Sequence, residues 1–457
     1  MSAREQAPTF TAAARETLGG PTWLRGRRAA AHELLAHTPL PHPNDEDWRY
    51  GRLGELDLTQ VSPLGPAVAP AGASALERLE RSVPELAAAA QRFVEHLGEL
   101  GALAVALDGA VLGLERGPAA EKAGVRLTSL ATCDEAPAGL GARLSGAVDA
   151  FGRLAEAFLA DGLVVQVPAG AQLEEPIVLI HVAGPASRGH AVFPRTLVEV
   201  GEGAAATVIE LQLSSDGTVL LVPVSEISVG PGAHATYCSS QELGAGAWQL
   251  GYQASAIERG GVLRSFAAAL GGAYARHWSR TVLAGEGGES ELLAVYLGHG
   301  DQVQEFRTFQ EHLAARTRSE LVFKGAVGDN ARSVYTGLVR MHHGARRADA
   351  AQTNRNLVLS GSAEAYSVPN LDIQENDVRC SHASAVGPID REQLFYLESR
   401  GVPTAVAERL ILLGFFEDLL ARAPDAGFGA HLRAIVAERL APGSDEAALL
   451  AAVRGAQ

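Results

Sequence analysis

Residues 198–207 read Val-Glu-Val-Gly-Glu-Gly-Ala-Ala-Ala-Thr, and residues 227–236 read Ile-Ser-Val-Gly-Pro-Gly-Ala-His-Ala-Thr. The two stretches align at an offset of 29 residues (227 minus 198). In each, a short strand-like run ends in a glycine turn that small residues follow. A repeat of roughly 20 to 50 residues built from strands and turns indicates coils that stack on one another.

This repeat predicts a right-handed parallel β-helix. Alanine and glycine at the turns let each coil stack directly on the next, about 4.8 Å away. The strand-like pattern begins at Asp161-Gly162 and continues through short apolar runs that Gly, Pro, Ser or Asp separate. A β-sandwich in which two similar hairpins recur is the alternative, and one legible repeat leaves it open.

Helical periodicity flanks the strand-like region on both sides. We therefore expect a mainly β protein with three domains: a mostly helical N-terminal domain at 1–160, a β-helix core at 161–388 and a helical C-terminal domain at 389–457. In the last of these, Asp390 and Thr404 are suited to cap helices, and Gly414 interrupts the second helical pattern. A further helix is expected at about 445–453.

Composition and charge restrict the functional classes. The chain has 457 residues, of which 47% are hydrophobic and 20% charged, as in ordinary globular proteins. Its formal charge is -15, and every basic residue except Lys122 and Lys324 is arginine, so nucleic-acid binding is not expected. The N-terminus lacks a signal-peptide pattern and no uncharged apolar run reaches roughly 18 residues, so we expect a cytoplasmic protein without membrane contact.

The common catalytic motifs are absent from the sequence. It contains no phosphate-binding P-loop, no His-Glu-x-x-His, no Gly-x-Ser-x-Gly and no Cys-x-x-Cys. The three cysteines, Cys133, Cys238 and Cys380, are widely separated, which fits a reducing compartment. Three thiolates are also too few for an iron-sulfur cluster held by four cysteines. We therefore expect no ATP hydrolysis and no complete cluster site within this chain.

Cys380-Ser381-His382 is the one compact group of soft metal ligands. On a strand, residues i and i+2 project from the same face, so the Cys380 thiol and the His382 imidazole would point to one metal ion or one cluster edge. The alternative is structural. Cys380 would then be a small buried residue and His382 an ordinary surface side chain.

Several segments in unbroken order then indicate a family. They are Phe323–Val327, Ala331–Gly337, Gln352–Ser360, Val368–Leu371, Asp377–Ala383 and Leu394–Gly401. Together they resemble the SufB/SufD family of iron-sulfur cluster assembly proteins. The Cys-Ser-His segment, with Pro21–Leu24 and Glu46–Tyr50, is more similar to SufD than to SufB. The resemblance spans nearly the whole chain, although residues 51–160 carry little of it.

The resemblance implies a non-catalytic scaffold subunit of a SufBCD-type complex. Its β-helix would pair with a SufB-like subunit, and its C-terminal helices would dock a SufC-like ABC-type ATPase. Cys380 and His382 match a segment at the SufB interface, where a transient iron-sulfur cluster is assembled, and His382 is the stronger candidate for an iron contact. The isolated chain would bind no cluster stably and could pair with itself as a homodimer.

Two other functions stay open at this point. One is a purely structural partner that holds the SufB-like and SufC-like subunits without touching iron. The other is a β-helix enzyme that acts on polysaccharide, since this fold often hosts lyases and hydrolases. Such an enzyme needs carboxylates clustered on one face, whereas Asp372, Glu375 and Asp377 straddle an expected turn.

Overall fold

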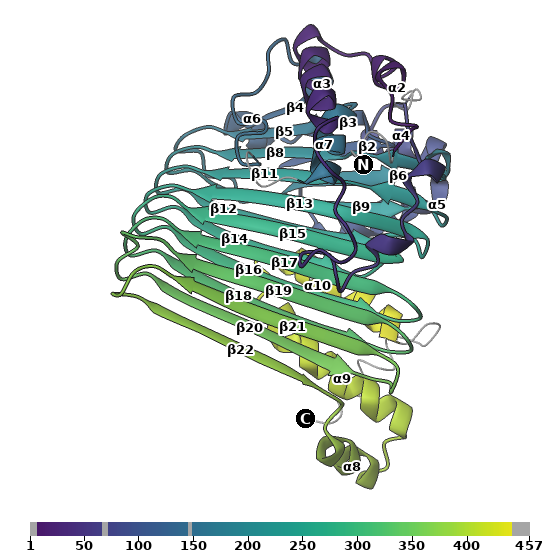
Figure 1. Cartoon of the computed structure of the whole chain (residues 1–457), viewed down its shortest axis with the longest axis vertical. Helices are drawn as coiled ribbons and strands as arrows, with labels where there is room; N and C mark the ends of the chain where they lie inside the picture. Colours follow the sequence, from purple (N-terminus) through teal and green to yellow (C-terminus); the bar gives the residue numbers. More distant parts are fainter. Residues whose placement is uncertain (1–6, 66–71, 145–148, 441–457) are drawn as a thin grey trace.

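The computed structural model describes residues 7–65, 72–144 and 149–440. Figure 1 shows a tall stack of parallel strands, with α3 and α7 beside the first coils and α8 below the last ones. The helices are α2 (Ala12–Glu16), α3 (Thr22–Leu35), α4 (Ala75–Ser82), α5 (Pro84–Leu97), α6 (Pro118–Lys122), α7 (Ala150–Ala157), α8 (Arg391–Ser399), α9 (Thr404–Leu420) and α10 (Ala426–Leu440). Short 3-10 turns lie at 53–55, 58–60, 130–132 and 185–187.

Most strands alternate along the chain between two sheets. Sheet 1 contains β4 (Arg126–Ser129), β5 (Leu163–Val167), β8 (Arg195–Val200), β11 (Val224–Val229), β13 (Ala247–Ile257), β15 (Tyr274–Leu283), β17 (Val303–His312), β19 (Arg332–Met341) and β21 (Glu364–Ile373). The short strands β1 (Ser62–Pro63), β7 (His190–Val192) and β10 (Val219–Leu221) pair beside this path.

Sheet 2 faces sheet 1 across the interior. It contains β2 (Ala102–Leu107), β3 (Ala110–Arg116), β6 (Ile177–Ala183), β9 (Ala205–Ser214), β12 (His234–Glu242), β14 (Val262–Ala269), β16 (Glu289–Gly298), β18 (Arg318–Val327), β20 (Asp349–Val358) and β22 (Arg379–Gly387). Each coil from β8 onward therefore adds one strand to each sheet.

The sequence repeat is the stacking register of this β-helix. Ile227 pairs in parallel with Val198, and His234 with Ala205, which reproduces the offset of 29 residues in both sheets. Neighbouring strands pair in parallel along the whole stack from β5 to β22. Hairpins would give antiparallel neighbours, so the predicted parallel β-helix is confirmed and the sandwich alternative is wrong.

The N-terminal segment continues the β-helix. The β2–β3 hairpin turns at Asp108 and Gly109, which both have positive φ, and β2 pairs in parallel with β6. A tight two-residue turn of this kind requires such backbone angles, which explains the Asp-Gly sequence. The segment at 1–160, which we expect to be mostly helical, thus also extends sheet 2 by two strands.

Helices from both ends of the chain cover the outer face of sheet 2. Leu412 and Phe416 of α9 and Phe428 of α10 are buried in one cluster with α4, α5 and the sheet. Two polar contacts fix this packing: Lys324 on β18 donates to the Phe415 carbonyl at 2.8 Å, and His431 contacts Glu242 at 2.6 Å. The C-terminal helices thus use much of their apolar surface within this chain.

Three local expectations for the C-terminal segment have different outcomes. The Asp390 side chain accepts from the Glu392 amide as the N-cap of α8, as predicted. Thr404 is not a cap: it is the first residue of α9, whose N-cap is Pro403. Gly414 does not end the pattern, because α9 runs through it to Leu420 and packing against sheet 2 holds the helix there. The helix expected at 445–453 lies outside the described residues.

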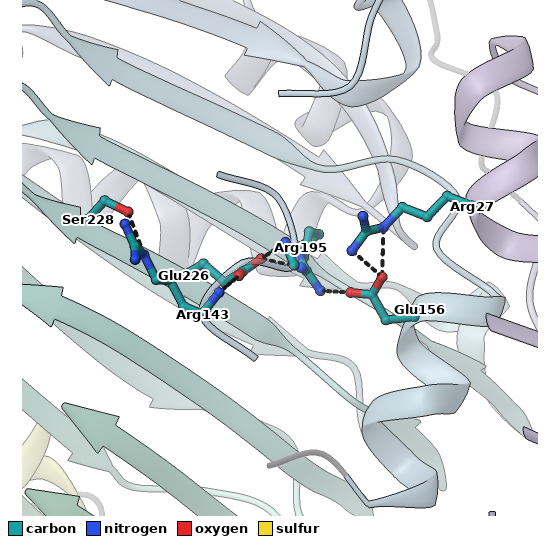
Figure 2. A network of polar contacts seen from close by, with 7 residues as sticks. Arg27, Arg143, Glu156, Arg195, Glu226 and Ser228 are labelled. Carbon is teal, nitrogen blue, oxygen red and sulfur yellow. Dashed lines mark hydrogen bonds and ion pairs between the residues drawn. The ribbon is translucent and has the colours of Figure 1, made fainter. Parts of the chain in front are cut away.

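A buried ion network fixes the N-terminal helices to sheet 1 (Figure 2). Arg195 on β8 is 1% exposed and contacts Glu156 of α7 at 2.5 Å and Glu226 of β11. Glu156 also accepts from Arg27 of α3, and backbone amides of residues 141 and 143 donate to Glu226. Burial by itself would raise the pKa of Glu156, but the charges of Arg195 and Arg27 outweigh it and lower that pKa. The network specifies where these helices sit on the first coils.

Candidate functional site

The last coil of the β-helix is open. Among the described strands, β21 pairs only with β19 and β22 only with β20, so both end a sheet. The side chains of these strands are exposed or half-buried, whereas corresponding positions in earlier coils are mostly buried. An edge strand presents unpaired N–H and C=O groups to any chain that can add a strand. The coil is therefore a surface on which another β-structure could stack.

Cys380 and His382 lie on β22 and face the interior at this open end. They pair in register with Ala350 and Gln352 of β20, which are each 1% exposed inside the β-helix. Residues in register project to the same side, so the thiol and the imidazole share one face, as strand alternation predicts. Across the opening, Ser384 of β22 donates to the Ser367 hydroxyl of β21 at 2.7 Å.

The Cys380 thiol is half-buried against the interior. It packs beside a cluster that includes Val339, Met341 and Ala350. Burial raises the pKa of Cys380 to about 11, and the nearby charge of Asp349 adds to the effect. The group is therefore a thiol at neutral pH, and a metal that binds it must displace its proton.

The ligand set within this chain is incomplete. In residues 7–65, 72–144 and 149–440, no group of three or more His, Cys, Asp or Glu side chains could hold a metal ion. Cys238 does not join Cys380, because it is buried on the outer face of sheet 2 in the cluster with the C-terminal helices. Cys133 follows the 3-10 turn at 130–132 and donates to the Ser129 carbonyl. The structure thus places Cys380 and His382 on one face of β22, and neither Cys133 nor Cys238 lies with them.

Gln352 was missed by sequence reasoning. It lies one coil below His382, and neither atom of its buried amide has a hydrogen-bond partner. The signal that could have found it is the repeat itself, because continuing the coils places residue 352 beside residue 382.

The family model for the SufBD core domain of the SUF system for iron-sulfur cluster assembly matches residues 182–415. This is just over half of the chain (234 of 457 residues). The chain belongs to the SufB/SufD family. Within that family it is most like SufD, and the matched core contains β22 with Cys380 and His382.

Three relatives illustrate the likeness. The chain is 28% identical to the iron-sulfur cluster assembly protein SufD of Escherichia coli over 424 residues, which cover 92% of this chain and 94% of the relative. It is 28% identical to the SufD of Bacillus subtilis over 61% of this chain and 64% of that protein. It is 34% identical to a SufBD family protein of Mycobacterium tuberculosis over 57% of this chain and 66% of that protein. The last two matches thus span somewhat less than two thirds of the relatives.

No helix in the described part of the chain is long and apolar enough to cross a membrane.

Proposed function

We propose that the chain is a non-catalytic scaffold subunit that contributes Cys380 and His382 to a nascent iron-sulfur cluster at the open end of its β-helix. The observation that carries the proposal is the position of these two soft ligands on the interior face of a coil on which no other described strand stacks. An iron-sulfur cluster normally takes four protein ligands, so the remaining ones would come from another subunit. The high pKa of Cys380 fits an isolated chain that holds no cluster stably.

The proposed partner at the open end is a SufB-like subunit. Its last coil would stack on β21 and β22 and close the interior above Cys380 and His382. Ile373 and Val386, at the ends of these strands, are 49% and 47% exposed and would be covered by such contact. Since the surface is an ordinary sheet edge, the isolated chain could use it to form a homodimer.

The proposed docking site for a SufC-like ABC-type ATPase is α8 with the exposed side of α9. Phe395 and Tyr396 on α8 are 70% and 57% exposed, and adjacent exposed aromatic residues are typical of binding surfaces. Deleting the C-terminal helices would be a poor test, because α9 and α10 cover the outer face of sheet 2. Point substitutions on α8 leave that packing intact.

The arrangement of carboxylates favours the scaffold over a polysaccharide-active enzyme. Asp372 contacts Arg340 at 2.7 Å, and Glu375 accepts from the Gly344 amide at 3.1 Å. Both carboxylates thus contact the preceding coil, Asp372 at strand β19 and Glu375 at the turn that follows it. A purely structural role without iron contact remains the second candidate, and the same experiment distinguishes it.

The test is the substitution His382→Ala in a complex assembled anaerobically with a SufB-like and a SufC-like subunit. We expect iron content per complex to fall severalfold, and Cys380→Ser to have the same effect or a smaller one. The His382 side chain is exposed, so the free energy of unfolding should change by no more than about 0.5 kcal/mol. The melting temperature should therefore change little.

Iron content and melting temperature are measured on the same samples, and subunit stoichiometry confirms assembly. Normal iron loading by a correctly assembled His382→Ala complex would contradict the proposed cluster site. The purely structural role would then be the remaining candidate.

A further inference from the structure

The Gln352 amide is a buried polar group without a partner. Gln352 is 1% exposed, and neither its Nε2 nor its Oε1 atom has a hydrogen-bond partner. Its neighbours on the same face of β20 differ: the Asn354 amide donates to the Tyr296 hydroxyl at 2.8 Å, and the Asn356 amide donates to Asn354 at 2.7 Å. Since buried polar groups are almost always paired, the Gln352 amide calls for a partner that residues 7–65, 72–144 and 149–440 do not provide.

The surroundings of Gln352 leave few candidates for that partner. Directly below it in the stack lies Leu321 of β18, which offers no polar atom. Across the interior lies Gly337 of β19, where a Cβ atom would come within 2.1 Å of Gln352 Nε2 and 2.8 Å of the Tyr335 hydroxyl. That hydroxyl is hydrogen-bonded to Thr308 at 3.3 Å and not to Gln352. Glycine at this position makes room for the amide to extend fully across the interior. Directly above it in register lies His382.

The spacing fits a contact between the two side chains. Adjacent coils lie about 4.8 Å apart, so side chains in register stack one over the other. A neutral imidazole has one ring nitrogen that can bind a metal and one N–H that needs an acceptor. Histidines that bind metals nearly always donate this second N–H to an oxygen, which fixes the tautomer and the orientation of the ring.

We infer that Gln352 is the positioning residue of His382: when His382 binds iron through one ring nitrogen, Gln352 Oε1 accepts the hydrogen bond of the other ring N–H. The inference rests on the proposed role of His382 as an iron ligand. The amide is unpaired in the isolated chain because the exposed imidazole is not yet held over the opening. Iron and a partner subunit that closes the coil would bring the ring above the amide.

The chain offers a matched control in Gln310. This residue of β17 is 0% exposed, and both atoms of its amide also lack partners. It lies in sheet 1. The residues in register with it on the next two coils are Val339 and Leu371, and neither can bind a metal. Gln310 thus shares the burial and chemistry of Gln352 but not the site.

The experiment compares Gln352→Met, Gln310→Met and His382→Ala in the anaerobically assembled complex with SufB-like and SufC-like subunits. Methionine keeps the length of the side chain and removes both polar atoms. Ferrous iron alone is the probe, and its affinity is measured by titration. We expect Gln352→Met to weaken iron binding by about 10- to 100-fold and Gln310→Met to leave it unchanged.

A second readout separates positioning from structure. Replacing an unpaired buried amide by an apolar group should not lower the melting temperature in either glutamine variant. Pulsed electron paramagnetic resonance of a paramagnetic cluster should show a changed signal from the remote imidazole nitrogen in Gln352→Met only. If that variant folds poorly, Gln352→Asn, which keeps an amide but shortens its reach, should show the same loss of affinity.

The results for these variants separate the positioning role of Gln352 from the proposed iron-binding role of His382. If His382→Ala loses iron while Gln352→Met binds it normally, the positioning role is wrong and the cluster site stands. If His382→Ala itself binds iron normally, the cluster site fails and the positioning role fails with it. Equal losses in Gln352→Met and Gln310→Met would indicate a general effect of the interior and would also overturn the inference.

Discussion

Cys380 and His382 are neighbours on one strand but lie in different environments. The Cys380 side chain is half-buried against Val339 and Met341, whereas His382 is exposed at the opening. Burial disfavours the thiolate, which is the form that binds metals and reacts with electrophiles. In the proposed cluster site, this difference makes His382 the more accessible first contact for iron, and Cys380 would bind once its proton is displaced.

This environment predicts the reactivity of Cys380 in the isolated chain. With a pKa of about 11, about one thiol in a thousand is ionised at pH 8. Alkylation of Cys380 by iodoacetamide at pH 8 should therefore be more than 10-fold slower than in the urea-unfolded chain, and it should accelerate up to about pH 11. Mass spectrometry of the peptide that carries Cys380 gives the rate at each pH.

The variant Asp349→Asn serves as a control for the cause. Burial is the larger contribution and the charge of Asp349 the smaller one, so this variant should remain slow at pH 8. A folded protein whose Cys380 reactivity levels off near pH 9 would contradict the assignment.

At the scale of elements, the edge strand β22 determines how this chain could join another. The Arg379 amide donates to the Ala348 carbonyl, toward the β20 side. Successive residues of a strand direct their N–H groups to opposite sides, so the amides of 380, 382, 384 and 386 point to the free edge. Proline removes an amide donor, and at an edge position it does so without breaking the existing ladder.

We therefore predict that Val386→Pro blocks pairing with the SufB-like subunit and leaves the β-helix folded. Circular dichroism of the isolated variant should match the wild type, and co-purification of the SufB-like subunit should fall at least 10-fold. Val386→Thr, which keeps the edge amide and the β-branched shape, should still pair.

A substitution on α8 tests the other proposed surface in the same assay. Phe395→Ala should retain the SufB-like subunit and lose affinity for the ATPase, because Phe395 is exposed on a different element. Loss of both partners in either variant would mean that the two surfaces are not independent.

At the scale of the whole molecule, the interior contains titratable groups that acid would charge. His312 is 0% exposed and hydrogen-bonded to Thr317 and Ser319, and burial, with the charge of His342 adding to it, lowers its pKa to about 4. Burial also lowers the pKa of His181. Both histidines are therefore neutral inside the folded chain near neutral pH.

The sign of the resulting pH dependence follows from these shifts. The unfolded chain has an imidazole pKa of about 6.5, so it binds more protons than the folded chain as pH falls from about 6.5 to 4. The free energy of unfolding should fall across that window, by about 3 kcal/mol at pH 4 for His312. Thermal melts from pH 8 to pH 4 measure the loss.

The variant His312→Gln isolates one contribution. Glutamine can keep hydrogen bonds to Thr317 and Ser319 but carries no titrating group. At pH 8 its melting temperature should be close to that of the wild type, and its decline toward pH 4 should be shallower. An equally steep decline in the variant would mean that groups other than His312 cause the loss of stability in acid.

Local sequence patterns predicted the type of architecture and the shared face of Cys380 and His382. Val198 and Ile227 align because the strands on which they lie pair in register, and stacking of equal coils is a local property that leaves a repeat in the sequence. Strand alternation likewise placed Cys380 and His382 on one face, since the period of two depends only on the backbone.

The surroundings of those side chains, in contrast, depend on the tertiary structure. Cys380 and His382 lie on the last coil of the described residues, and Gln352 is buried beside Leu321 and Gly337 without a hydrogen-bond partner. The packing of α9 and α10 on sheet 2, and the continuity of helix α9 through Gly414, were likewise invisible in the sequence. The physical reason is that burial and pairing depend on residues far apart in the chain, whose proximity no local pattern records.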